Sequence, residues 1–151
     1  MTVVTKQYSP EEVTNALARK YQYFVSRGKN MFESNRNFHD FMDKDIFWGH
    51  VDFIIVSEEL ASEDIDAALD YFIRGHENKL TAKVLVAKGV TSEEMIKEMV
   101  DKGEDVTSLL NALINGISAL SVSSTLDLVN AFNKINNQYC SCYIPTVELV
   151  E

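Results

Sequence analysis

The chain has 151 residues, 46% of them hydrophobic, which is the size of one domain and enough to bury a core. Its 14 Lys and Arg stand against 23 Asp and Glu, and this net charge of −9 argues against a nucleic-acid or anionic-membrane surface. No stretch approaches the roughly 18 to 20 apolar residues of a membrane-spanning helix. We therefore expect a soluble single α/β domain over residues 1–151.

In the first third of the chain, local signals predict a short helix, a strand and a longer helix. Ser9 to Glu12 combines an N-cap serine, a proline and a capping-box glutamate, which is how a helix begins. Lys20 to Ser26 alternates aromatic and β-branched residues toward the turn residue Gly28, and this predicts a strand. Apolar residues at helical spacing from Asn30 to Asp43 indicate an amphipathic helix.

The middle of the chain alternates between buried strands and a long helix. Val51 to Val56 is a nearly continuous apolar run, which predicts a strand buried on both faces of a sheet. Ser57 is placed to cap a helix from Glu58 to Arg74, and we expect Gly75 to end that helix in the left-handed conformation. Ala82 to Ala87 is predicted as the next strand.

After Gly89, three further helices are expected. Thr91 to Glu94 forms a capping box at the start of the first one. Apolar residues recur at helical spacing from Val106 to Ile117 and predict the second. The third is expected from Thr125 to Lys134, because the asparagines that follow favour a turn.

The C-terminal region predicts two extended segments, Tyr139 to Ile144 and Val147 to Val150. Pro145 lies between them and indicates a sheet edge or a bend, because proline cannot donate to a ladder. Cys140 and Cys142 would share one face of the first strand. Two thiols fall short of the four ligands of a structural zinc site, so we interpret them as small residues in a sheet and expect no metal or cofactor.

Strands that alternate with helices predict an α/β fold. We expect a central mixed sheet of about four to five strands, flanked by amphipathic helices, with at least some parallel pairing.

Signatures of catalysis are lacking in the sequence. Six glycines are scattered singly without a phosphate-binding spacing, and neither HExxH nor GxSxG occurs. Of the three histidines, His39 and His76 are expected to face solvent, and His50 is expected to bond backbone groups where a helix meets a strand. Trp48 is interpreted as a core residue in preference to a partner contact. We therefore expect no enzymatic activity.

Several short blocks occur in an order that is characteristic of one protein family. Gly28 to Ser34 reads Gly-Lys-Asn-Met-Phe-Glu-Ser, and Asp45 to Ala61 contains a Phe-Trp-Gly-His entry into a hydrophobic strand followed by Ser-Glu-Glu-Leu-Ala. Ile65 to Arg74, Ala82 to Gly89 and Tyr143 to Leu149 follow in register. Together these blocks resemble the N-terminal domain of the GerAC family of spore-germination lipoproteins.

That resemblance implies a non-catalytic domain of the C subunit of a nutrient germinant receptor. Such a subunit is held by a lipid anchor on the outer face of the spore inner membrane, beside integral-membrane subunits. Because the sequence shows neither a signal peptide nor a lipobox cysteine, we expect an excised domain or a truncated relative. The alternative is a cytosolic α/β small-ligand sensor or enzyme, which would have an apolar pocket holding a metabolite.

The resemblance also singles out ten positions, for which it implies structural or interaction roles. They are Gly28, Trp48, Gly49, His50, Glu58, Glu59, Arg74, Lys88, Gly89 and Pro145.

Overall fold

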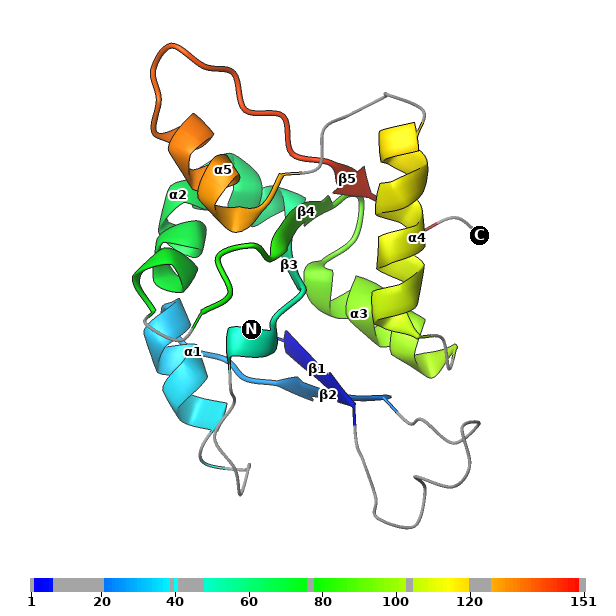
Figure 1. The fold of residues 1–151 in the computed structure, drawn as a ribbon. Helices are drawn as coiled ribbons and strands as arrows, with labels where there is room; N and C mark the ends of the chain where they lie inside the picture. Colours follow the sequence, from blue (N-terminus) through cyan, green and yellow to red (C-terminus); the bar gives the residue numbers. More distant parts are fainter. Residues whose placement is uncertain are drawn as a thin grey trace.

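The computed structural model describes residues 2–6, 21–38, 40, 48–75, 78–102, 105–119 and 126–149. The helix predicted at Ser9 to Glu12 lies outside these ranges, as do His39 and His76. In chain order the elements are β1 (Thr2–Lys6), β2 (Tyr21–Val25), α1 (Met31–Phe38), the 3₁₀ turn η2 (Trp48–His50), β3 (Phe53–Ser57), α2 (Glu58–Arg74), β4 (Lys83–Ala87), α3 (Ser92–Asp101), α4 (Val106–Ala119), α5 (Leu128–Ile135) and β5 (Thr146–Val147) (Figure 1).

A parallel sheet in the order β3-β4-β5 is covered by helices on both faces. Successive residues of a strand point to opposite faces, so each strand contributes to two cores. Ile54 and Val56 of β3 pack with α2 and α5, whereas Phe53 and Ile55 pack toward α3 and α4. Figure 1 shows α2 and α5 on one side of the sheet and α3 and α4 on the other. The fold is therefore a three-layer α/β/α arrangement.

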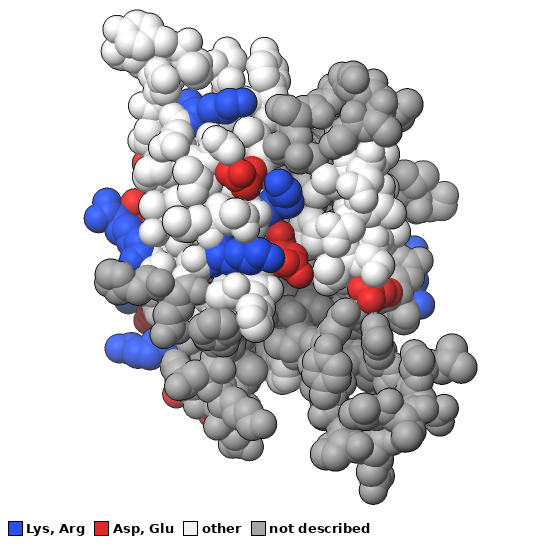
Figure 2. All heavy atoms as spheres, in the orientation of Figure 1, with Lys and Arg blue, Asp and Glu red and all other residues white. Residues whose placement is uncertain are grey.

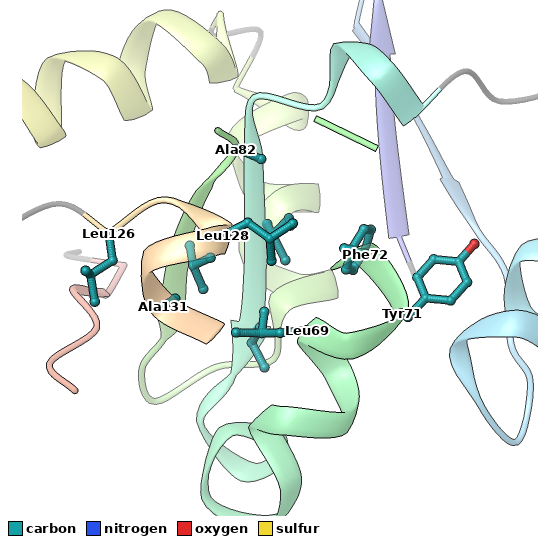
Figure 3. Close-up of a cluster of buried hydrophobic side chains, with 10 residues drawn as sticks. Leu69, Tyr71, Phe72, Ala82, Leu126, Leu128 and Ala131 are labelled. Carbon is teal, nitrogen blue, oxygen red and sulfur yellow. The ribbon is translucent and has the colours of Figure 1, made fainter. Parts of the chain in front are cut away.

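The core between the sheet, α2 and α5 is the larger of the two and is shown in Figure 3. Leu69 of α2 and Leu128 and Ala131 of α5 have no exposed surface there. Burying a leucine side chain stabilises the fold by about 1.5 to 3 kcal/mol. Such burial explains why residues 128–135 form a stable helix of only two turns.

The predicted α/β class and the expected parallel pairing are confirmed, but the described part of the central sheet has fewer strands than the expected four to five. Among the described residues the central sheet has three strands, and both of its pairings are parallel. β2, predicted from Lys20 to Ser26, pairs antiparallel with β1 in a separate two-stranded sheet, with Thr2 opposite Val25. This second sheet contacts α3. Strand signals in a sequence do not reveal which strands will pair, because pairing depends on distant contacts.

The α2 helix has the predicted bounds, and Ser57 caps it by accepting a hydrogen bond from the backbone N–H of Leu60 at 3.4 Å. Its path is not continuous, because Asp64 leaves the helical conformation (φ −160°, ψ 69°). The Asp64 carboxylate accepts a hydrogen bond from the backbone N–H of Ala67 at 3.1 Å, as an N-cap residue does. Asp64 therefore caps a second helical segment within α2.

The C-terminus of α2 differs from the prediction for Gly75, which has extended rather than left-handed backbone angles (φ −69°, ψ 123°). The Asn78 side chain instead donates a hydrogen bond to the carbonyl of Phe72 at 2.7 Å. The Asn78 side-chain amide thus satisfies a carbonyl at the end of the helix. In the predicted left-handed cap, backbone N–H groups would satisfy such carbonyls instead.

Capping residues determine where α3 and α5 begin. The predicted capping box of α3 is confirmed: Glu94 N–H donates to the Thr91 hydroxyl, and Thr91 donates back to the Glu94 carboxylate. These bonds from Thr91 lower the pKa of Glu94. The α5 helix begins at Leu128 rather than at Thr125, because Asp127 is its N-cap and Leu126 accepts a backbone hydrogen bond from Val84.

Substitutions at two glycines test how the local backbone conformation affects stability. Gly89 has a positive φ of 74°, so Gly89→Ala is expected to lower the free energy of unfolding by about 1 to 2 kcal/mol. Gly116, in the exposed face of α4, leaves open space for a methyl group, so Gly116→Ala is expected to raise it by about 0.5 to 1 kcal/mol. Urea denaturation measures both changes. A neutral Gly89→Ala variant would contradict the left-handed requirement.

Candidate functional site

The carboxyl ends of the parallel strands bring together three of the ten family-motif positions. In open α/β sheets this edge is where ligands usually bind. Gly89 donates its backbone N–H toward the Glu58 carboxylate at 3.4 Å, so the turn after β4 contacts the start of α2. Lys88 donates its backbone N–H to Val147 at 2.9 Å, and its ammonium lies 3.6 Å from Glu148. Glu58, Lys88 and Gly89 thus join β3, β4 and β5 at one edge.

The opposite end of β3 holds a second group of positions in the turn Trp48–His50. The half-buried Trp48 ring stands edge-on to Tyr71 and Phe72 of α2, with ring centroids 6.5 and 6.0 Å apart. Its carbonyl accepts a hydrogen bond from Val51 at 3.2 Å, which turns the chain into β3. These contacts agree with the interpretation of Trp48 as a core residue. Gly49 and His50 shape the same turn, and the His50 side chain is exposed.

Gly28 lies in a tightly packed turn between β2 and α1. The buried Ser26 hydroxyl donates a hydrogen bond to the carbonyl of the buried Ser34 at 2.6 Å. A methyl group at Gly28 would lie 2.5 Å from the backbone nitrogen of Ser34, a distance that no ordinary contact tolerates. Glycine is therefore required here for close approach.

The remaining positions have different environments. Arg74 donates to both carboxylate oxygens of Asp70, at 2.7 and 2.6 Å, and these hydrogen bonds raise its pKa. Because Arg74 is exposed, the pair contributes little stability. Glu59 is exposed in the first turn of α2. Pro145 is buried, and its carbonyl accepts a hydrogen bond from Val86 at 2.9 Å, which attaches β5 to β4.

The environments of the two cysteines differ from the strand that was predicted for them. The described residues 138–144 form no strand, so Cys140 and Cys142 do not share a strand face. Cys140 is exposed, whereas Cys142 is half-buried and points its thiol toward the carbonyl of Ala131 at 3.9 Å. Burial raises the pKa of the Cys142 thiol, and Lys134 opposes this only in part.

The geometry therefore assigns structural contacts to most family-motif positions and does not bring all ten into one cleft. Across the described ranges, no group of three or more His, Cys, Asp or Glu residues is placed to hold a metal ion. Within the same ranges, no helix is both long and apolar enough to cross a bilayer. The sequence interpretation missed the capping side chains of Asp64 and Asn78, although Asx residues beside helix ends were the available signal.

Comparison with known proteins connects this chain to one family. A family model described as the spore germination protein N-terminal domain matches residues 1–149. The chain belongs to this family. Neither the curated proteins nor the solved structures gave a match. The family assignment confirms the resemblance that the sequence blocks predicted. It identifies the chain as an N-terminal domain of a spore germination protein.

We expect Gly28→Ala to lower the free energy of unfolding by about 1 to 3 kcal/mol, because the added methyl group overpacks the turn against Ser34. Thermal and urea denaturation measure the loss. The Gly116→Ala variant is the control, since its methyl group enters open space. Equal stability of the wild-type chain and Gly28→Ala would show that the turn relaxes at no cost.

The two thiols are expected to react at different rates. Cys140 is exposed, whereas Cys142 is partly buried and has a raised pKa, so fewer Cys142 thiols are ionised at neutral pH. Iodoacetamide should therefore modify the Cys142→Ser variant, which retains Cys140, several-fold faster than the Cys140→Ser variant. Mass spectrometry over time gives both rates. Equal rates would mean that Cys142 is as accessible as Cys140.

Proposed function

We propose that this chain is the N-terminal domain of the C subunit of a nutrient germinant receptor, where it acts as a non-catalytic scaffold or coupling module. The observation that carries the proposal is the family match, which spans residues 1–149 of the 151. Half a domain or a single motif could be shared by unrelated proteins, whereas a match of this extent includes every element of the fold.

The contacts of the family-motif positions support a scaffold role. Gly28 permits close packing, Trp48 attaches the entry of β3 to α2, and Pro145 attaches β5 to β4. These residues stabilise the framework and leave the outer surfaces of the helices and loops for partners. A scaffold needs this division between a rigid interior and a contact surface.

The proposed partners are the integral-membrane subunits of the receptor, at the outer face of the spore inner membrane. In this proposal a lipid anchor provides the membrane attachment and the domain itself contacts protein. The net charge of −9 supports a protein contact over an anionic lipid surface, since like charges repel. The same charge disfavours nucleic acid as a partner.

Co-purification tests this function. The tagged protein, produced in spores together with the membrane subunits and extracted from inner membranes in mild detergent, should carry those subunits through affinity purification. Deleting residues 1–149 from the subunit should abolish the association and slow nutrient-induced germination.

A protein that never associates with the membrane subunits would contradict the scaffold role. Native mass spectrometry of the purified chain provides the second measurement. A metabolite bound stoichiometrically would support a small-ligand sensor in place of a scaffold.

A further inference from the structure

Residues 136–144 connect α5 to β5 and carry two free thiols that are two residues apart. Cys140 is exposed, whereas Cys142 is half-buried. Figure 1 shows the segment projecting from the fold beyond α5, and Figure 2, in the same orientation, shows this projecting end on the open surface of the molecule. A small oxidant in solution can therefore reach the exposed thiol of Cys140 directly.

Chain connectivity keeps the two cysteines close to the separation that a disulfide needs. An extended chain spans at most about 3.6 Å per residue, so the Cα atoms of Cys140 and Cys142 lie no more than about 7.2 Å apart. A disulfide needs a Cα separation of roughly 4.4 to 6.8 Å, which a slight bend of the backbone provides. Ser141 is exposed, and none of residues 141–144 belongs to a strand. The backbone can therefore bend here without breaking the hydrogen bonds of a sheet.

The fold turns the Cys142 side chain inward. Its thiol points toward the Ala131 carbonyl of α5 at 3.9 Å, and the side chain packs against the core cluster between the sheet, α2 and α5. This burial raises the pKa of the thiol, so less of the reactive thiolate forms. Completing a bond to Cys140 requires Cys142 to turn outward and to lose these contacts. The pair therefore combines an accessible thiol with a restrained one.

We propose that Cys140 and Cys142 form a reversible thiol–disulfide site for low-molecular-weight disulfides, in which Cys140 is the entry thiol and Cys142 is the restrained resolving thiol. In the first step, the Cys140 thiolate attacks one sulfur of the small disulfide, forms a mixed disulfide and releases one small thiolate. In the second step, Cys142 turns outward, loses its proton and attacks the Cys140 sulfur, which releases the second small thiolate. The two released thiolates take up the protons that the cysteines lose. Two protein thiols are thereby oxidised to one disulfide, and the small disulfide is reduced to two thiols.

Two other uses of paired thiols fit these observations less well. Across the described ranges, no third His, Cys, Asp or Glu side chain joins the two thiols in a metal-binding group, and a structural zinc site needs four ligands. A permanent disulfide would leave no free thiol to pack against α5, where Cys142 lies. A disulfide at the surface that closes so short a ring is open to reduction, which suits reversible use.

Exchange with hydroxyethyl disulfide tests the site. This probe is uncharged, so the net charge of −9 does not repel it. The reduced wild-type protein is mixed with the probe in native buffer and in urea, and acid-quenched samples are analysed by mass spectrometry. We expect a transient adduct of one mercaptoethanol, followed by a product that has lost two hydrogen atoms and contains a Cys140–Cys142 bond in its peptide map. Dithiothreitol should restore both thiols.

Two matched variants separate the roles of the thiols. Cys142→Ser should stop at the mercaptoethanol adduct of Cys140, because the resolving thiol is gone. Cys140→Ser should form its adduct several-fold more slowly, because Cys142 is half-buried. Ring closure of the wild-type adduct should be several-fold slower in native buffer than in urea, because only the folded chain packs Cys142 against α5. Thermal unfolding verifies that the variants fold, and Cys142→Ala repeats the test without a hydroxyl group.

Several outcomes would contradict the proposal. A stable mercaptoethanol adduct on the wild-type protein, without a Cys140–Cys142 bond, would overturn the site. A bond that forms in urea but not in native buffer, or disulfide-linked dimers as the main product, would overturn it as well. Equal rates of ring closure in native buffer and in urea would contradict the restraint on Cys142. Equal adduct rates of the two serine variants would contradict the role of Cys140 as the entry thiol.

Discussion

The burial of β4 on both faces is the constraint on which the rest of the structure depends. Val84, Leu85 and Ala87 expose at most 1% of their surface, so helices must cover the sheet on both sides. α2 and α5 cover one face and α3 and α4 cover the other. Since parallel strands need long connections, these helices also serve as the crossovers that return the chain to the same edge.

That arrangement separates the family-motif positions into groups with distinct physical tasks. One group joins the carboxyl ends of the strands, where Glu58 receives the N–H of Gly89. Another packs Trp48 between the entry to β3 and the end of α2. Gly28 acts locally, through its close approach to Ser34. In this chain, these positions therefore make mainly framework contacts.

Residues 136–144, which connect α5 to β5, show how a loop is anchored to a rigid framework. Its backbone is attached to α2 through Asn136 and Asp66, and its apolar side chains enter the core. Tyr143 remains outside because the inward positions on either side of it are occupied by Cys142 and Ile144. At this end of the loop, inward and outward side chains alternate along the chain.

The sequence by itself determined the elements whose signals are local. The bounds of α2, the cap at Ser57 and the capping box of α3 follow from side chains within a few residues of each other. The order of the short blocks also identified the family. Only the tertiary structure decided the strand pairing, the extended backbone at Gly75 and the separate environments of Cys140 and Cys142. These features depend on residues distant in sequence. A segment in which inward and outward side chains alternate has the same sequence pattern whether it pairs in a β-sheet or forms an anchored loop.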